Sequence, residues 1–274
     1  MIEVQSIAVP GFIYGTAWKE ERTAGLVGLA LAAGFRAIDT ANQRKHYFEA
    51  GVGEAIAAGG VARDELWLQT KFTYVRGQDQ RLPYEPSAPL ATQLEQSFTS
   101  SLEHLGVDLL DSYILHGPWS DAGWHRNDRQ VWAAMESLQR AGRARLIGVS
   151  NIGLDQLAIL CDEAEVAPAF VQNRCYARTG WDREVRALCR DRGIVYQGFS
   201  LLTANRRELA EPEVAAIAAR AGASVPQLVF RFAQAIGILP LTGTSNPEHM
   251  RQDLAAAELE LEPADAVALE RLAG

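Results

Sequence analysis

Polar side chains that could do chemistry recur at the ends of short apolar segments. They are Asp39, Lys71, His116, Ser150, Asn151, Gln172 and Ser200, each at or just after the end of a predicted strand. Groups of these types can hold and transfer a proton or bind a polar ligand. Singly, Asp39 could cap a turn, Lys71 could be a solvated strand end, and His116 could bind a backbone carbonyl. Their equivalent positions favour one shared cavity instead.

Eight short β-rich segments alternate with longer segments of helical periodicity, as expected for repeated strand–helix units. The predicted strands are residues 11–16, 35–39, 66–71, 109–116, 144–150, 169–173, 195–200 and 238–243. The predicted helices are residues 22–33, 49–58, 90–105, 130–141, 154–164, 183–192, 213–221 and 226–235. Such alternation predicts an α/β fold, a (β/α)8 TIM barrel, in which the carboxyl ends of the strands meet at the active-site face.

Length and composition are consistent with this fold. The 274 residues, 48% of them hydrophobic, predict one barrel domain over residues 1–274. The net charge of −8 argues against a nucleic acid or an anionic membrane as the main partner. The three cysteines show no CxxC spacing, so we expect neither disulfides nor a metal site. No signal peptide or apolar stretch of 18 residues is evident, and a soluble cytoplasmic protein is expected.

Seven motifs in order resemble the aldo-keto reductases over nearly the whole chain. They are GFRAIDTA, HYFEAGVGEAI, LWLQTK, LLDSYILHGP, LIGVSN, VQNRCY and GFS. The resemblance implies an oxidoreductase that reduces aldehydes and ketones to alcohols, with NADPH as cofactor and NADH as the alternative. It implies a catalytic tetrad of Asp39, Tyr47, Lys71 and His116. Because no side chain donates a hydride, the protein would supply the proton, the geometry and the stabilisation of negative charge.

Tyr47 is the expected proton donor. A phenol is a weak acid unless its anion is stabilised, which Lys71 would do while Asp39 orients the lysine. His116 would aim the substrate oxygen or assist proton delivery. The segment DTANQRKHYFE is longer than in the commonest form of the family, so His46 competes for the role. We expect Tyr47, with QRK as extra loop, because YFEAGVGEAI resembles the family's tyrosine, acidic residue and helix start.

The resemblance also implies a cofactor site. Ser150, Asn151 and Gln172 would hydrogen-bond the nicotinamide carboxamide, and Phe199 would stack on its ring in place of the usual tyrosine. The other expected cofactor-binding residues are Ser200, Leu201, Gly243, Thr244, Ser245, His249 and Asp253. The small polar residues among them precede a helix that opens at Pro247, and a helix start of this kind suits phosphate.

The chain departs from the family where the adenosine 2′-phosphate is expected. Leu241 and His249 stand where the family usually has a lysine and an arginine. Arg251, Arg206 and Arg207 are the nearby candidates to replace them. NADPH is therefore expected from the resemblance rather than from these residues.

The substrate side departs from the family as well. Gly117 follows His116 where many members carry a tryptophan, which predicts a wide pocket. Its expected walls are Trp18, Phe72, Trp119 and Trp124. Residues 244–274 are too few for the long closing loop of many members, so we expect loose specificity for small carbonyl compounds and high KM values. The expected assembly is a monomer or a weak homodimer.

Two other functions account for part of the pattern. A class I aldolase-like barrel would form a Schiff base at Lys71, but it does not require the serine–asparagine pair or the aromatic residue of the seventh strand. A cofactor-binding regulatory subunit with little turnover would share the fold. The complete candidate tetrad favours catalysis.

Overall fold

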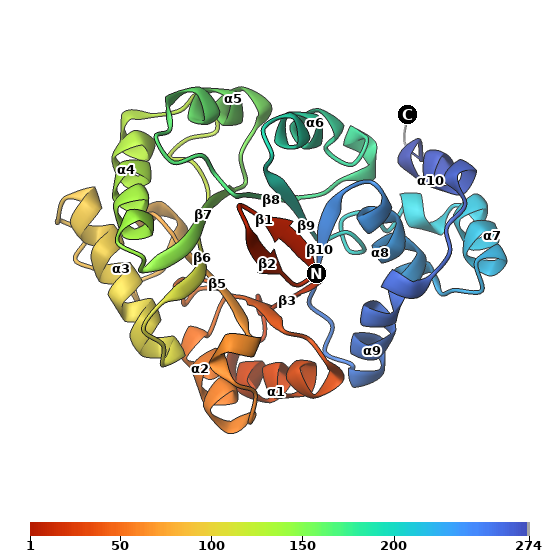
Figure 1. Ribbon diagram of the computed structural model, residues 1–274, viewed down its shortest axis with the longest axis horizontal. Coiled ribbons are helices and arrows are strands. Elements are labelled where there is room, and N and C mark those ends of the chain that lie inside the picture. Colours follow the sequence, from red (N-terminus) through yellow and green to blue (C-terminus); the bar gives the residue numbers. More distant parts are fainter. Residues whose placement is uncertain (273–274) are drawn as a thin grey trace.

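Eight parallel strands close into a barrel in the computed structural model, which describes residues 1–272 (Figure 1). The strands are β3 (Ile13–Gly15), β4 (Ala37–Asp39), β5 (Trp67–Phe72), β6 (Leu110–Leu115), β7 (Ala144–Ser150), β8 (Phe170–Arg174), β9 (Val195–Phe199) and β10 (Ile238–Thr242). Neighbours in the chain are neighbours in the barrel, and β10 closes it against β3. The predicted (β/α)8 TIM barrel is confirmed, and every predicted strand overlaps an observed one.

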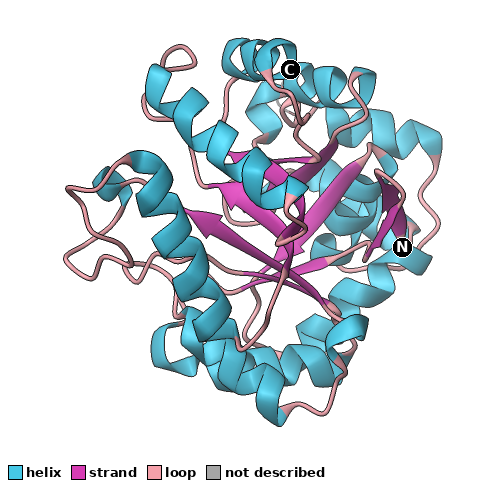
Figure 2. Cartoon of the chain, turned by 60° about the vertical axis from the view of Figure 1, so that its left-hand side comes forward, coloured by secondary structure: helices cyan, strands magenta, loops and turns pink. Residues whose placement is uncertain are grey.

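Helices surround the barrel on all sides (Figure 2). They are α1 (Thr23–Ala33), α2 (Glu49–Ala58), α3 (Leu90–Leu105), α4 (Arg126–Arg140), α5 (Leu154–Glu163), α6 (Arg183–Asp191), α7 (Pro212–Arg220), α8 (Val225–Ala235), α9 (Pro247–Ala255) and α10 (Pro263–Glu270). Short 3-10 turns are Glu20–Arg22, Arg63–Glu65, Val75–Gly77, Ala177–Thr179, Glu208–Ala210 and Ala256–Glu258. Within the described residues, no helix has the length and apolar character needed to cross a membrane.

Local sequence signals explain where several helices begin. At α8 the side chains of Ser224 and Gln227 bond each other's backbone amides, a capping box that satisfies the first turn. At α4 the Asp128 carboxylate accepts the His125 amide at 2.8 Å, so this helix begins four residues before the predicted start at residue 130. The periodic apolar pattern alone did not show this earlier beginning.

A two-stranded hairpin covers one end of the barrel and was not predicted. Strands β1 (Ile2–Val4) and β2 (Ile7–Val9) pair antiparallel in the centre of the ring of helices in Figure 1. The turn residues Gln5 and Ser6 have φ values of 47° and 65°, without the glycine that usually signals such a turn. Val4 and Val9 are buried in the inner core of the barrel. The hairpin therefore seals the end opposite the carboxyl ends of the strands.

Helices α2 and α3 approach each other closely at Gly53. A Cβ atom at this position would lie 2.0 Å from the backbone oxygen of His104. We expect Gly53→Ala to lower the free energy of unfolding by about 1–3 kcal/mol, because backbone atoms of α3 would have to move. Gly28→Ala on α1 is the matched control, since nothing lies within 4 Å of its Cβ and alanine favours helix by roughly 0.5–1 kcal/mol. Urea unfolding followed by circular dichroism measures both; equal midpoints for Gly53→Ala and the unmodified chain would contradict this packing.

Candidate active site

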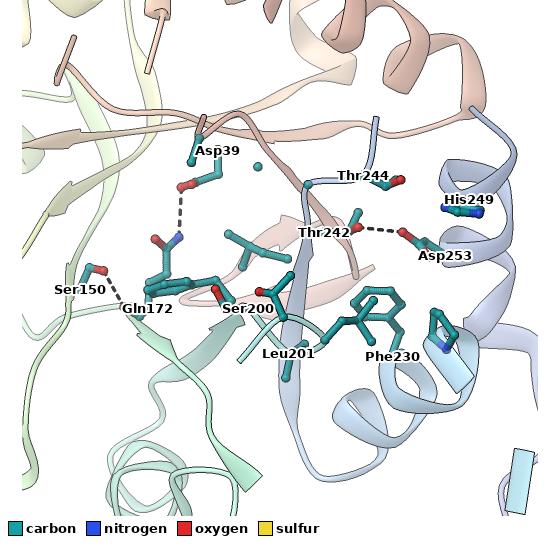
Figure 3. A pocket seen from close by; sticks show the side chains of 18 of the residues that line it. Asp39, Ser150, Gln172, Ser200, Leu201, Phe230, Thr242, Thr244, His249 and Asp253 are labelled. Atoms are coloured by element: carbon teal, nitrogen blue, oxygen red, sulfur yellow. Dashed lines mark hydrogen bonds between the residues drawn. The ribbon is translucent and has the colours of Figure 1, made fainter. Parts of the chain in front are cut away.

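An elongated cavity of about 520 Å³ opens at the carboxyl ends of the strands (Figure 3). It is lined by thirteen of the residues expected from the sequence, namely Asp39, Tyr47, His116, Ser150, Asn151, Gln172, Phe199, Ser200, Leu201, Gly243, Thr244, His249 and Asp253. Lys71 is fully buried directly behind Asp39. Ser245 is exposed beside the cavity and does not line it.

Asp39 and Lys71 form a buried ion pair between β4 and β5. The Lys71 Nζ atom lies 2.7 Å from Oδ1 and 2.6 Å from Oδ2 of Asp39, and it donates to the Thr40 backbone oxygen at 2.8 Å. These three contacts engage all three N–H groups of the ammonium. Burial lowers the pKa of Lys71, and the Asp39 carboxylate counteracts that lowering. The pair therefore places a compensated positive charge under the cavity floor.

Tyr47, not His46, faces this ion pair. The extra residues form a turn in which the Gln43 backbone oxygen accepts both the His46 and the Tyr47 amides, at 3.1 and 3.0 Å. The Tyr47 ring centre lies 5.3 Å from Lys71 Nζ, while His46 stacks on Trp18 with ring centres 3.9 Å apart. Among the described residues, the Tyr47 hydroxyl has no hydrogen-bond partner. Burial and the Asp39 carboxylate raise the pKa of Tyr47, so the phenol stays protonated at neutral pH.

His116 completes the cluster as a neutral imidazole. Its ring centre lies 5.8 Å from that of Tyr47. Burial, followed by the charge of Lys71, lowers the pKa of His116 to about 3. The Thr73 hydroxyl lies 2.7 Å from Nδ1 and can donate to it, in which case Nε2 carries the ring N–H. His116 is then a hydrogen-bond donor at neutral pH.

A network of three buried glutamines supports Asp39 from the barrel interior, and two of them contact it directly. The Asp39 Oδ1 atom accepts from Gln69 Nε2 at 2.7 Å and from Gln172 Nε2 at 3.0 Å, in addition to Lys71. Gln197 links the two glutamines, because its Oε1 accepts from both at 2.8 and 2.9 Å. Gln69 and Gln197 were not expected as site residues. Their signal in the sequence is a glutamine inside a strand that is otherwise buried and largely apolar.

The wall next to this cluster presents amides, hydroxyls and an aromatic face. The Ser150 hydroxyl donates to the Gln172 backbone oxygen at 2.6 Å, and Asn151 Nδ2 donates to the His116 backbone oxygen at 2.7 Å. Asn151 and Ser200 adopt left-handed φ values of 54° and 58°. Phe199 also lines the cavity. These groups lie where the sequence expected a nicotinamide site.

None of the four expected substrate-pocket residues lines this cavity. Phe72 lies in the outer core, with its ring centre 5.4 Å from that of Tyr74, because strand side chains alternate and Lys71 takes the inward position. Trp124 is buried in the same core. Trp119 packs against Tyr74 and His125, and Trp18 is 68% exposed against His46. Phe72 and Trp124 are thus buried in the core away from this cavity, and a substrate pocket walled by Trp18 and Trp119 stays a prediction.

A parallel barrel that carries an ion pair, a phenol and an imidazole at its strand ends has the arrangement of a TIM-barrel enzyme. A model of the aldo/keto reductase family matches residues 13–273. An aldo-keto reductase of Mycobacterium avium (strain 104) is 32% identical over 253 residues, 92% of this chain and 82% of that protein. Glyoxal reductase of Bacillus subtilis (strain 168) is 32% identical over 240 residues, 87% of this chain and 79% of that protein.

The fold agrees with these sequence matches. The crystal structure of an aldo/keto reductase from Brucella melitensis has a TM-score of 0.84 to this chain at 26% identity, covering 99% of this chain and 98% of the other. The chain belongs to the aldo/keto reductase family, a family of oxidoreductases that act on carbonyl groups.

The glutamine network yields a stability prediction. Gln69→Leu or Gln197→Leu should each lower the free energy of unfolding by about 1–3 kcal/mol, because one polar group of the surviving glutamine, Gln197 Nε2 or Gln69 Oε1, stays buried without its partner. In the double variant both of these unpaired groups are gone, so its loss should be smaller than the sum of the single losses. Urea unfolding of the unmodified chain, the two single variants and the double variant measures these losses. Losses that add to within roughly 0.3 kcal/mol would contradict the network.

Proposed function

We propose that this chain reduces aldehydes and ketones to alcohols with a nicotinamide dinucleotide as hydride donor and Tyr47 as proton donor. The observation that carries the proposal is the convergence of Tyr47 and His116 above the buried Asp39–Lys71 pair. Family membership supports the same reaction class. Glyoxal is the substrate in the name of one relative, and small aldehydes of this kind are the substrate class we propose for testing.

The cavity fits a nicotinamide cofactor. Gln172 directs its Nε2 into the barrel toward Asp39 and Gln197, which leaves its Oε1 to accept an amide N–H. Ser150 and Asn151 add polar groups on the same wall, and Phe199 supplies an aromatic face for a planar ring. A cofactor bound in this way would supply the hydride.

The side chains would orient the substrate, donate the proton and stabilise the developing negative charge. His116 would donate a hydrogen bond from Nε2 to the substrate oxygen and hold it near Tyr47. The Tyr47 hydroxyl would give its proton to that oxygen as negative charge develops there. The Lys71 ammonium, 5.3 Å from the phenol ring, would stabilise the phenolate that remains, and Asp39 would keep the ammonium in place.

The two alternative functions make different demands on the site. A Schiff-base mechanism needs a deprotonated lysine, whereas Lys71 makes three short contacts to acceptors and pairs with a carboxylate. This geometry disfavours the aldolase-like alternative. A regulatory subunit would share the fold and the cofactor cavity. Tight cofactor binding without reduction of any aldehyde in a broad panel would identify that function.

Replacement of the proton donor tests the proposal directly. Tyr47→Phe should lower kcat/KM for aldehyde reduction by about 10²–10⁴-fold, because it removes the acid and leaves the ring. The Kd for the cofactor, measured by fluorescence titration, should change little. His46→Gln is the matched control, since His46 packs against Trp18 outside the cluster, and it should retain turnover. A large loss in His46→Gln together with a small loss in Tyr47→Phe would assign the proton to His46.

The pH dependence provides a second test. Because the pKa of Tyr47 is raised and that of His116 is lowered to about 3, neither group changes charge between pH 6 and 9. We expect kcat/KM for reduction to show no titration by these two groups in that range. Oxidation of the alcohol requires the phenolate, so its rate should rise with pH. A reduction rate that falls as the pH rises, with a midpoint between pH 6 and 7, would instead identify a histidinium acid if the fall were absent in His116→Asn.

A further inference from the structure

We call the end of the cavity away from Tyr47 the far end. Within the part of the chain that the structure describes, it lacks the positive charge that a bound phosphate requires. Its wall consists of residues from α8 and α9, including Pro226, Phe230, His249, Gln252 and Asp253. Among the described residues, no lysine or arginine lines the cavity at either end. Figure 3 places Asp39, Ser150 and Gln172 on one side of the view and Thr242, His249 and Asp253 on the other. Asp253 is therefore the charged group of this far end.

We propose that this far end selects NADH over NADPH and that Asp253 is the specificity-determining residue. The inference rests on the proposed function, which places the nicotinamide beside Tyr47 and hence the adenosine at the far end. The two cofactors differ only in the adenosine 2′ substituent, a neutral hydroxyl in NADH and a phosphate in NADPH. A carboxylate can accept a hydrogen bond from the hydroxyl, whereas it repels the phosphate.

Asp253 has a carboxylate oxygen that can accept a hydrogen bond from a ligand. It is only 3% exposed, and its Oδ2 accepts a hydrogen bond from the Thr242 hydroxyl at 2.7 Å. Among the described residues, its Oδ1 receives no donor, although Asp253 lines the cavity. Burial raises the pKa of Asp253 to about 6, so the carboxyl group is mostly ionised at pH 7.5. A ribose hydroxyl would satisfy the remaining oxygen.

Among the described residues, none of the nearby cations lines the cavity. Arg251 is exposed and contacts the Glu248 carboxylate through both its Nε atom, at 3.2 Å, and a terminal nitrogen, at 2.5 Å. Lys19 donates to the Gly243 backbone oxygen at 2.7 Å and does not line the cavity. Arg206 and Arg207, the other candidates from the sequence, are exposed and do not line it either.

The start of α9 offers little to an additional phosphate. Asn246 Oδ1 already accepts the Glu248 amide at 2.9 Å, and the Thr244 hydroxyl oxygen accepts the Asn246 amide at 3.2 Å. The Glu248 carboxylate lies in the first turn of the helix, where it partly offsets the positive helix end. Two amide donors of the turn are therefore already used, and the Glu248 carboxylate adds a negative charge. This observation is independent of Asp253 and favours the same cofactor.

The decisive experiment compares the two cofactors with the full chain. At pH 7.5 and with glyoxal as the carbonyl probe, kcat/KM should favour NADH over NADPH by at least about tenfold, and the Kd values should show the same order. Asp253→Asn should shift the ratio toward NADPH by about tenfold, through a gain for NADPH and a loss for NADH. Glu258→Gln is the matched control, because it removes an exposed carboxylate outside the cavity and should leave the ratio unchanged.

The outcomes separate this inference from the function on which it rests. A preference of the unmodified chain for NADPH would overturn the inference while supporting reduction, and so would an unchanged ratio in folded Asp253→Asn. Tighter binding of NADH without turnover would support the inference and contradict catalysis. Binding of neither cofactor would overturn both.

Discussion

A lysine ammonium with no exposed surface lies at the base of the cavity, and the arrangement of the site follows from the need to compensate its charge. Removal of one partner from a buried ion pair typically costs about 3–5 kcal/mol, so Lys71 and Asp39 depend on each other. The compensation extends further, because Asp39 also accepts hydrogen bonds from two glutamines. Burial, followed by the charge of Lys71, lowers the pKa of His116, and Lys71 Nζ lies over the ring of Tyr47. Burial, with charge in the barrel interior as the second cause, thus keeps Tyr47 protonated and His116 neutral.

Strand register makes this arrangement possible. Asp39 of β4 lies beside Gln69 of β5, and Lys71 follows two residues later on the same inward face. The alternate residues of β5 face outward, where Thr70 bonds Glu49 and Phe72 joins the aromatic core. A shift of one residue would exchange these two sets and bury Phe72 against the carboxylate. The same register therefore separates the chemistry from the packing.

The two ends of the cavity have contrasting electrostatic character. At the Tyr47 end a positive charge is buried and compensated, whereas the far end presents the acceptor Asp253 and no lysine or arginine from the described residues. The arginine closest in sequence, Arg251, pairs with Glu248 on the surface of the same helix. A ligand that spans the cavity therefore meets a hydrogen-bond donor and a shielded cation at one end and an acceptor at the other.

The sequence by itself determined the barrel, because apolar periodicity and strand–helix alternation are local properties, and it placed Asp39, Lys71, His116 and Gln172 at the strand ends. It could not choose between Tyr47 and His46 by spacing, since the choice depends on how the turn at Gln43 folds back. Only the tertiary structure showed that Gln69 and Gln197 reach Asp39 and that Phe72 points outward. It also showed that, among the described residues, no lysine or arginine lines the cavity and that Arg251 pairs with Glu248. Burial and the direction of a side chain depend on how segments are oriented in space, which sequence spacing does not record.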